Sequence, residues 1–420
     1  MTPRGLDWAR RPGARFPVAL ALIAVACAES AEDRTTLAID TLPTGTIRVS
    51  SSGPVWTPET AWTLEEDLTL GTVDDSRPGE QFADIATILV DSSGTIYVLE
   101  RQTQEIRVFD PAGVFTHRIG GAGDGPGEMR RAAGMTMGPG GRLWVVDPGR
   151  GYEVFERDGT FVDQYPRGLL GVLRPWPARF ADDGLLYDWT TDAFEREMSV
   201  RPALASGSGI DFRDEAYVYP IRVSDDFGTI DTLPRLEYRS EHILDIPFGD
   251  GLTVFQDRRG SIWFARNRRY AIHRRTPDGD TIGIFEVPAV PAPVTPAERD
   301  SVLEQDALRP SVLRFDPADL PHDKPIVRQI FGDAEGHLYV VPELDGVPAG
   351  TAVDVFRDDG TYLGRMPFRG GSCSRTRDPW PLGITSTSLR RTSSTCRTCS
   401  DCGSFARTES IPTRDRQTSG

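Results

Sequence analysis

The sequence predicts an all-β fold, a six-bladed β-propeller made of four-stranded antiparallel blades with an incomplete sixth blade. Three observations predict it. A strand, glycine turn, strand pattern recurs along the chain, a second hairpin follows each clear copy, and the copies are spaced as propeller blades require. With 420 residues, 38% of them hydrophobic, the chain can bury a large core.

The N-terminus predicts export. Residues 1–26 combine an arginine-bearing start with the apolar run Phe16–Ala26, whose 11 residues are too few to span a bilayer. We therefore predict that residues 1–26 are a signal peptide that is removed. Residues 27–60, rich in Ser, Thr, Pro and Glu, then predict a flexible tether.

The end of the signal peptide suggests a lipid anchor. Ala24-Val25-Ala26-Cys27 resembles a bacterial lipobox, which implies lipidation of Cys27. Because Ala28 rather than Asp follows, the resemblance also implies sorting to the outer membrane in a host with two membranes. The alternative is ordinary cleavage at a small-x-small site, which leaves Cys27 near a free terminus.

The repeat defines residues 61–370 as the propeller. Ile88–Val98 has the same pattern as Met135–Val145, and three shorter copies follow. Each copy is centred on a glycine between two short apolar runs, and these anchor glycines are Gly94, Gly141, Gly184, Gly260 and Gly336. A further hairpin follows the clear copies, with Asp-Gly turns such as Asp158-Gly159 and Asp359-Gly360, the strongest local hairpin signal.

The spacing of the anchor glycines predicts insertions. Spacings of 47 and 43 residues fit one blade each, whereas the two spacings of 76 residues must contain extra chain. One insertion has a helix start, since Thr295-Pro296-Ala297-Glu298 has the form of a capping box with proline at the first helical position. We predict a helix over Pro296–Arg309.

The five repeat units do not include the segment that precedes the first of them, so we expect a sixth blade. Trp62–Leu70 is a plausible strand before the first full unit. In many propellers such a strand completes the last blade and so removes an open sheet edge.

The C-terminal residues 371–420 lose the β pattern, and 19 of them are Ser or Thr. We interpret this tail as disordered or as the product of a frameshift, because another frame from Gly383 can encode the His-Leu-Tyr-Val found at 337–340 when codons are chosen freely. Cys396, Cys399 and Cys402 have no fourth ligand nearby, so no metal site is assigned to them.

Charge limits the partners. The chain carries a net charge of -15, although both ends are basic, so its middle is strongly acidic. Such a body repels phosphates and anionic lipid, so we expect no nucleic acid partner and membrane contact only through the lipid anchor. We expect a monomer.

Residues 62–370 resemble the bacterial six-bladed β-propeller proteins related to NHL repeats. The most specific element is Arg118–Met129, which contains Gly123-Asp124-Gly125-Pro126-Gly127-Glu128 and resembles the glycine-rich connector between blades, with Met129 in place of an aromatic residue. The resemblance implies fold far more than function. Some relatives are lyases or lactonases with a metal at the propeller axis, but no position here matches their ligands.

Three sets of residues are candidates for binding. The five histidines lie in different units and could meet at the axis, although packed or solvated histidines are the simpler interpretation. Arg266-Asn267-Arg268-Arg269 is a basic cluster that could bind an anion or remain a solvated loop. Four tryptophans could stack on a sugar or peptide, but two of them occupy the repeat's aromatic position and are expected in the core; the four are Trp144, Trp176, Trp189 and Trp263.

Two functions remain open. We prefer an exported or surface-anchored binding module for a protein, peptide or small-molecule ligand, in the periplasm, outer membrane or cell surface. The alternative is a metal-dependent lyase or lactonase with its site at the propeller axis. No catalytic, cofactor or metal-ligating residue is assigned.

Overall fold

The computed structural model describes residues 36–367, with internal gaps, and residues 404–405. The gaps are residues 64–67, 72–76, 78, 168–175, 177, 192–215, 225–226, 241–245, 250, 267, 309–313, 334 and 349–350. All described residues belong to one compact unit, Thr35–Gly420. The predicted signal peptide, Cys27 and the predicted tail, apart from 404–405, lie outside the described residues.

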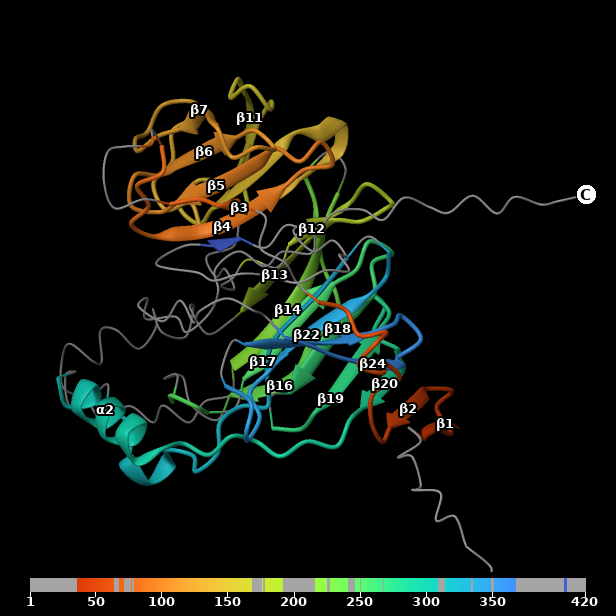
Figure 1. Cartoon of the computed structure of the whole chain (residues 1–420). Coiled ribbons are helices and arrows are strands. Elements are labelled where there is room, and N and C mark those ends of the chain that lie inside the picture. Colours follow the sequence, from red (N-terminus) through yellow and green to blue (C-terminus); the bar gives the residue numbers. More distant parts are fainter. Residues whose placement is uncertain are drawn as a thin grey trace, which may run out of the picture. The chain divides into compact units, whose positions relative to one another are not determined.

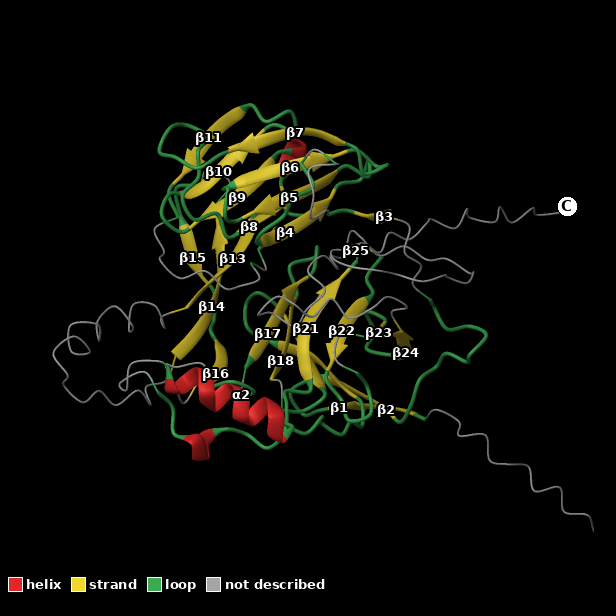
Figure 2. Ribbon diagram, turned by 60° about the vertical axis from the view of Figure 1, so that its left-hand side comes forward, coloured by secondary structure: helices red, strands yellow, loops and turns green. Residues whose placement is uncertain are grey.

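The chain forms a β-propeller of antiparallel blades, five of which are described (Figures 1 and 2). Blade 1 is β4 (Ile85–Val90), β5 (Ile96–Glu100), β6 (Glu105–Phe109) and β7 (Phe115–Gly120). Blade 2 is β8 (Gly134–Met137), β9 (Leu143–Asp147), β10 (Gly151–Phe155) and β11 (Phe161–Tyr165). The predicted fold class is therefore confirmed.

The remaining blades follow the same order of strands. Blade 3 is β12 (Arg179–Phe180), β13 (Leu186–Thr191), β14 (Ala216–Val223) and β15 (Ile230–Thr232), and β16 (Leu236–Ser240) also pairs with β14. Blade 4 contains β17 (Leu252–Gln256), β18 (Ile262–Arg266), β19 (Ala271–Arg275) and β20 (Thr281–Glu286). Blade 5 is β21 (Val327–Gly332), β22 (Leu338–Pro342), β23 (Ala352–Phe356) and β24 (Tyr362–Pro367).

The anchor glycines recur because the turn between the first two strands needs a left-handed residue. Gly94 has φ +86°, and the other four anchor glycines also have positive φ. An aspartate opens the turn in blade 1, where one carboxylate oxygen of Asp91 accepts the backbone N–H groups of Ser93 and Thr95. Asp257 and Asp333 repeat this arrangement in blades 4 and 5.

Neighbouring blades share apolar cores and buried polar contacts. One core joins residues of blades 1 and 2, and another joins blades 4 and 5. Between blades 2 and 3, the fully buried carboxylate of Asp188 accepts the hydroxyl of Tyr152 at 2.8 Å and Nε of Arg167 at 2.7 Å. Its other oxygen accepts the indole N–H of Trp176 and the backbone N–H of Trp189, each at 2.6 Å.

The N-terminal segment contacts both blade 5 and blade 1. Trp56 and Trp62 pack on the core of blade 5, and Leu68 and Leu70 pack on the core of blade 1. Within this segment, β3 (Leu68–Thr69) pairs with β25 (Ser404–Phe405). These contacts agree with the prediction that a strand near residues 62–70 contributes to a sixth, incomplete blade together with the C-terminal part of the chain.

A hairpin extends blade 4 outward. β1 (Leu37–Thr41) pairs with β2 (Ile47–Ser51), and β2 runs parallel to β20, so this sheet has six strands. Residues 37–51 therefore differ from the flexible tether predicted for 27–60. The reason is that Val49 is buried in the core between blades 4 and 5, which gives this segment a docking site that composition does not reveal.

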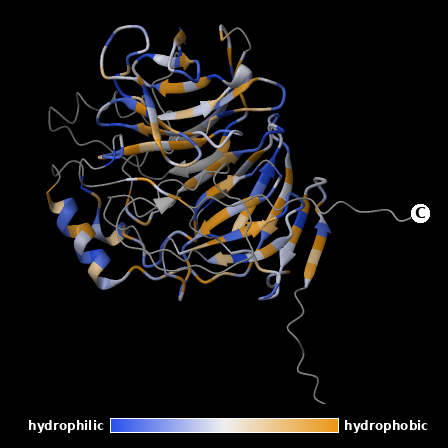
Figure 3. Cartoon of the chain, turned by 45° about the horizontal axis from the view of Figure 1, so that its top comes forward, coloured by the Kyte–Doolittle hydropathy of each residue, from blue (hydrophilic) through white to orange (hydrophobic). Residues whose placement is uncertain are grey.

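The predicted insertion helix is confirmed as α2 (Pro296–Ala307), and its capping box between Thr295 and Glu298 is formed. Figure 3 shows that most of α2 is hydrophilic, in keeping with its exposed surface. Short 3-10 helices span Pro139–Gly141 and Pro317–Asp319. Among the described residues, no helix has the length and apolarity needed to cross a membrane.

Candidate functional site

The two ends of a blade differ in what they carry. At one end of each blade, the second strand connects to the third and the fourth strand connects to the next blade. We call this end the connector end, and we call the opposite end the turn end. The turn end holds tight turns such as residues 91–95 and 257–261. Both insertions leave and rejoin the blades at the connector end. One separates β13 from β14, and its residues 192–215 lie outside the described part of the chain; the other separates β20 from β21 and contains α2. In repeat folds, insertions on one face often mark the binding face.

The glycine-rich stretch joins β7 to β8 at the connector end, as predicted for a blade connector. Gly120 and Gly127 have positive φ, and a Cβ on Gly120 would overlap the Met129 side chain. Met129 is fully buried in the core between blades 1 and 2, so it takes the place that the resemblance gives to an aromatic residue.

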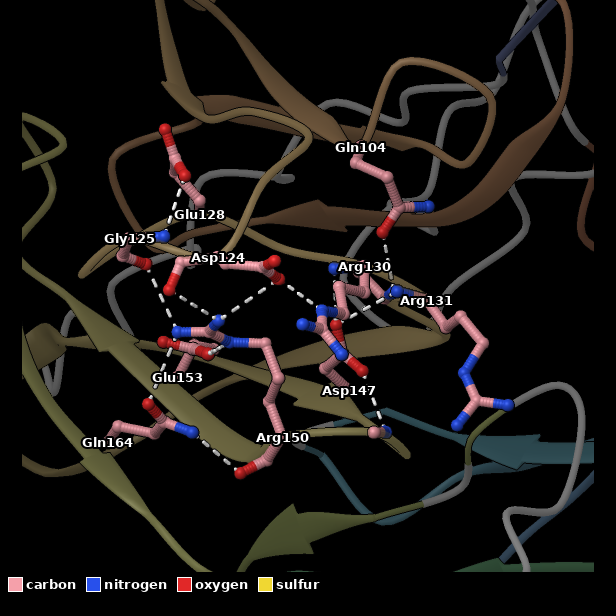
Figure 4. A network of polar contacts seen from close by, with 12 residues as sticks. Gln104, Asp124, Gly125, Glu128, Arg130, Arg131, Asp147, Arg150, Glu153 and Gln164 are labelled. Carbon is pink, nitrogen blue, oxygen red and sulfur yellow. Dashed lines mark hydrogen bonds and ion pairs between the residues drawn. The ribbon is translucent and has the colours of Figure 1, made fainter.

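A buried carboxylate fixes the end of this connector (Figure 4). Asp147, at the end of β9, accepts the backbone N–H groups of Arg130 at 2.7 Å and Arg131 at 2.9 Å. Glu100 occupies the same position in blade 1. Burial alone would raise the pKa of Glu100, but hydrogen bonds from Thr103, Asp84 and Ala83 outweigh it and lower the pKa. The carboxylates of Asp147 and Glu100 accept hydrogen bonds from backbone N–H groups, so their role is structural.

Arg150 ties the connector to blade 2 in the same network (Figure 4). Its Nε donates to Glu153 at 2.6 Å, and its terminal nitrogens donate to the carbonyl oxygens of Asp124 and Gly125. Burial raises the pKa of Glu153, which the charge and hydrogen bond of Arg150 only partly oppose. The guanidinium groups of Arg130 and Arg150 are therefore engaged in holding the connector.

A groove of about 600 Å³ opens at the connector end of blade 4. It forms where the parallel strands β2 and β20 end and their continuations separate. The chain after β2 runs to blade 5, where the N–H of Val55 donates to the carbonyl of Tyr362, and the chain after β20 reaches Glu343 through Ala292. Tyr270 and Ile326, both in the core between blades 4 and 5, line the groove.

The polar lining of this groove is cationic and rich in hydroxyl groups. Arg268 and Arg269, from the turn between β18 and β19, are exposed and line it together with Thr36, Ser50 and Ser52. Glu286 is the one acidic residue of the lining, and it is engaged by Arg48 at 3.8 Å and by the hydroxyl of Ser50 at 3.4 Å. A terminal nitrogen of Arg268 also donates to the carbonyl oxygen of Asp323 at 3.3 Å, so the groove has two exposed arginines beside its apolar lining, one of them already hydrogen-bonded.

The basic cluster identified in the sequence thus contributes to the groove, but only through Arg268 and Arg269. Asn267 lies outside the described residues, and Arg266 is exposed but is not part of the groove lining. Sequence reasoning missed the hydroxyl side of the groove, because residues 36–52 were assigned to a tether. A hairpin signal was present there, since Leu42-Pro43-Thr44-Gly45 separates two short β-forming runs.

The described histidines are not gathered at an axis. Described histidines lie on β7, on β19, before β21 and in the β21–β22 turn, and His242 lies outside the described residues. His273 stacks on Phe264 with ring centroids 5.0 Å apart, and burial lowers the pKa of His273. The Nε2 atom of His117 lies 3.0 Å from the carbonyl oxygen of Arg157.

Among the described residues, one trio of potential metal ligands lies close together: Asp333, Glu335 and His337. It is the turn motif of blade 5. Asp333 accepts the backbone N–H groups of Glu335 and His337 on one oxygen, and on the other it contacts Nδ1 of His337 at 2.9 Å and the Tyr339 hydroxyl at 2.8 Å. Both oxygens of this carboxylate therefore make hydrogen bonds within the turn, as the carboxylates of Asp91 and Asp257 do in blades 1 and 4.

The four candidate tryptophans are all buried, which confirms the core role predicted for Trp144 and Trp263. Trp176 and Trp189 are buried as well, so the stacking role considered for them is wrong. The repeat explains one difference within the set. Nε1 of Trp263 donates to the turn aspartate Asp257, whereas blade 2 has Gly138 at that position and Nε1 of Trp144 is buried without a hydrogen-bond partner among the described residues.

The first strands of neighbouring blades contact each other, as β4 and β8 do and as β17 and β21 do. An axial metal site would draw ligands from such strands. The five described first strands, β4, β8, β12, β17 and β21, contain no Asp, Glu, His or Cys. The groove of blade 4 is the remaining candidate for a ligand site among the described residues.

Comparisons with known proteins agree with the blade pattern. A family model described as a 6-bladed beta-propeller matches residues 69–148, which hold blade 1 and the first half of blade 2. No curated protein matches the chain.

Similar solved structures are distant. A predicted exported protein of Bacteroides fragilis NCTC 9343 has 12% identity and a TM-score of 0.45, over 76% of this chain and 79% of that one. Virginiamycin B lyase from Staphylococcus aureus has 14% identity and a TM-score of 0.36, over 79% and 84%. The calcium-binding protein regucalcin from Agrobacterium tumefaciens strain C58 has 13% identity and a TM-score of 0.36, over 74% and 81%.

Proposed function

We propose that this chain is an exported β-propeller that works as a binding module and holds a protein, peptide or small-molecule ligand at the connector ends of its blades. One observation carries the proposal: the groove of about 600 Å³ lies at the connector end of blade 4, the end from which the insertion containing α2 also leaves this blade. A volume of this size falls within the range of ligand sites, about 300–1,000 Å³. The Arg268–Arg269 pair and nearby hydroxyls supply the few polar groups that orient a ligand.

The proposed cell address rests on the N-terminal residues. Cleavage after Ala26 and lipidation of Cys27 would place the propeller in the periplasm, on the outer membrane or on the cell surface, as a monomer held by its lipid anchor. Metabolic labelling with palmitate tests this. We expect labelled protein in the membrane fraction, and a Cys27→Ser variant without label; equal labelling of the variant would contradict the anchor.

A ligand panel measured on the purified full-length chain tests binding against catalysis. The panel contains peptides, oligosaccharides and lactones, and each member is tested for saturable binding and for turnover with Ca²⁺, Mg²⁺ or Zn²⁺ present. A binding module is expected to bind a member of the panel and return it unchanged. Turnover that EDTA abolishes would support the alternative, a metal-dependent lyase or lactonase, and would contradict the proposal.

A further inference from the structure

The groove of blade 4 runs across the strands of its sheet. At the connector end these strands follow the order β19, β20, β2 and β1. One residue from each strand lines the groove, and each pairs with the next: Ala271, Glu286, Ser50 and Ala38. Neighbouring strands lie about 4.8 Å apart, so three spacings make this row about 14 Å long. A small molecule of that length can therefore lie across the sheet.

One wall of the groove is apolar. The segment that follows β20 supplies Val287, Pro288, Ala289 and Pro291, and Ile326 lines the groove from the chain before β21. None of these side chains carries a charge or a hydrogen-bonding group. An apolar ligand body packed against this wall leaves water without stranding a polar side chain, so its burial is favourable. The wall therefore favours a ligand whose middle part is apolar.

Arg269 offers a cation at the β19 end of the groove. It precedes β19 by two residues, it is exposed, and its guanidinium group makes no hydrogen bond or ion pair with the described residues. Arg268, by contrast, donates to the carbonyl oxygen of Asp323 at 3.3 Å. A guanidinium group presents paired donors that match the two oxygens of a carboxylate. Arg269 is therefore the group suited to receive a carboxylate.

Acidic residues restrict a ligand's negative charge to that end. Glu286 lies in the middle of the row, and its carboxylate is 3.8 Å from Arg48. Asp40 lies on the groove face of β1, two residues beyond one of the lining residues. Both carboxylates repel an anion at the centre of the groove or near β1. A ligand carboxylate is therefore best placed beside Arg269.

The β1–β2 end of the groove offers an uncharged donor instead. Oγ of Ser52 accepts the backbone N–H of Thr36 at 2.8 Å and the Thr36 hydroxyl at 3.0 Å. Both residues line the groove and are exposed. Because a hydroxyl has one hydrogen and two lone pairs, these two contacts leave the hydrogen of Ser52 to donate. This end of the groove therefore matches an uncharged acceptor, such as a carbonyl or sulfonyl oxygen.

We propose that the blade 4 groove binds a small amphipathic monocarboxylate. Its carboxylate pairs with Arg269, its apolar body lies along residues 287–291, and an uncharged acceptor at its far end receives a hydrogen bond from the Ser52 hydroxyl. The inference deepens the proposed binding function, on which it rests, because it names the class of ligand. The chain has a net charge of -15 and so repels polyanions, whereas a single carboxylate meets a local cationic group.

Fluorescence titration of the purified full-length chain tests the proposal. The probe is 6-(dansylamino)hexanoate, which carries a carboxylate, an apolar chain and a sulfonyl acceptor, and its matched control is the primary amide of the same acid. The wild-type chain is expected to bind the carboxylate at least about tenfold more tightly than the amide. Unlabelled octanoate should displace the probe, whereas acetate at the same concentration should not, because acetate lacks an apolar body.

Three variants test whether the probe lies in the groove. Arg269→Gln should bring the preference for the carboxylate toward one without changing the affinity for the amide. Arg259→Gln is the matched control, because Arg259 is exposed at the turn end of blade 4 and pairs with Asp358 at 3.5 Å, and it should keep the preference. Ala38→Trp fills the β1 end of the groove from an exposed position, so it should weaken binding of both compounds and leave their ratio unchanged. Circular dichroism checks that each variant is folded.

The outcomes separate the class of ligand from the general function. A preference that survives Arg269→Gln, or an affinity that survives Ala38→Trp, would overturn the groove assignment. Displacement by acetate as effective as that by octanoate would indicate a simple anion site and overturn the amphipathic ligand. No binding of either compound would overturn the inference, and a panel member that still bound the chain would then support the binding module alone.

Discussion

Asp188 offers the sharpest test of how the blades are held together. Its carboxylate is fully buried between blades 2 and 3 and accepts four hydrogen bonds, at distances of 2.6–2.8 Å. One donor, Arg167, has only 2% of its side chain exposed. An Asp188→Asn substitution preserves the volume but places an NH₂ group against donors and leaves the arginine without its counter-ion. Breaking such a buried ion pair costs about 3–5 kcal/mol.

The assay is urea denaturation followed by tryptophan fluorescence and circular dichroism. Trp176 and Trp189 both donate to Asp188, so fluorescence reports directly on this interface. The variant should lose about 3–5 kcal/mol of unfolding free energy and melt roughly 4–7 °C lower. Asp278→Asn is the control, because Asp278 is exposed, and its unfolding free energy should change by less than about 0.5 kcal/mol.

A loss below about 1 kcal/mol for Asp188→Asn would refute the reasoning. It would mean that Arg167 is not held as a buried cation or that the contact between blades 2 and 3 is looser than described. Separate fluorescence and circular dichroism transitions would show instead that the blades do not unfold together.

Three further predictions follow from the same structure. Glu100→Gln should lower the free energy of unfolding by about 2–3 kcal/mol at pH 7. Because the pKa of Glu100 is lowered in the folded chain, the difference in urea midpoint between this variant and wild type should shrink as the pH falls below about 4. Gly151→Ala should destabilise the chain by about 3 kcal/mol or more, because Gly151 has positive φ and a Cβ there would overlap a backbone carbonyl oxygen. Gly45 also has positive φ but has open space around it, so Gly45→Ala should cost only about 1–2 kcal/mol in the same assay. Trp263→Phe should cost about 1–2 kcal/mol more than Trp144→Phe, since only Trp263 loses a hydrogen bond; equal costs in thermal melts would contradict this.

The blades could be predicted because their signals are local. Gly94 and the other anchor glycines mark turns that need positive φ, and the capping box at Thr295 marks the start of α2. Trp144 and Trp263 were expected in the core because they share one position in the repeat. Each of these signals lies within a few residues of the feature that it predicts.

The groove could not be predicted in the same way, because it depends on contacts between distant segments. Parallel pairing joins residues 47–50 to residues 283–286, and no local pattern announces it. The buried ion pair of Asp188 with Arg167 likewise depends on where two blades meet. The arginines at 268 and 269 were visible as a cluster, but the hydroxyl-bearing side of their groove comes from the distant residues 36–52.

Hydrogen–deuterium exchange of the full-length chain tests most directly the claim that residues 37–51 extend blade 4 and form one side of the groove. Because β2 pairs with β1 on one side and with β20 on the other, residues 47–51 are predicted to exchange slowly, as the inner strands of the blades do. Exchange at residues 47–51 as fast as in an unstructured segment would contradict this claim.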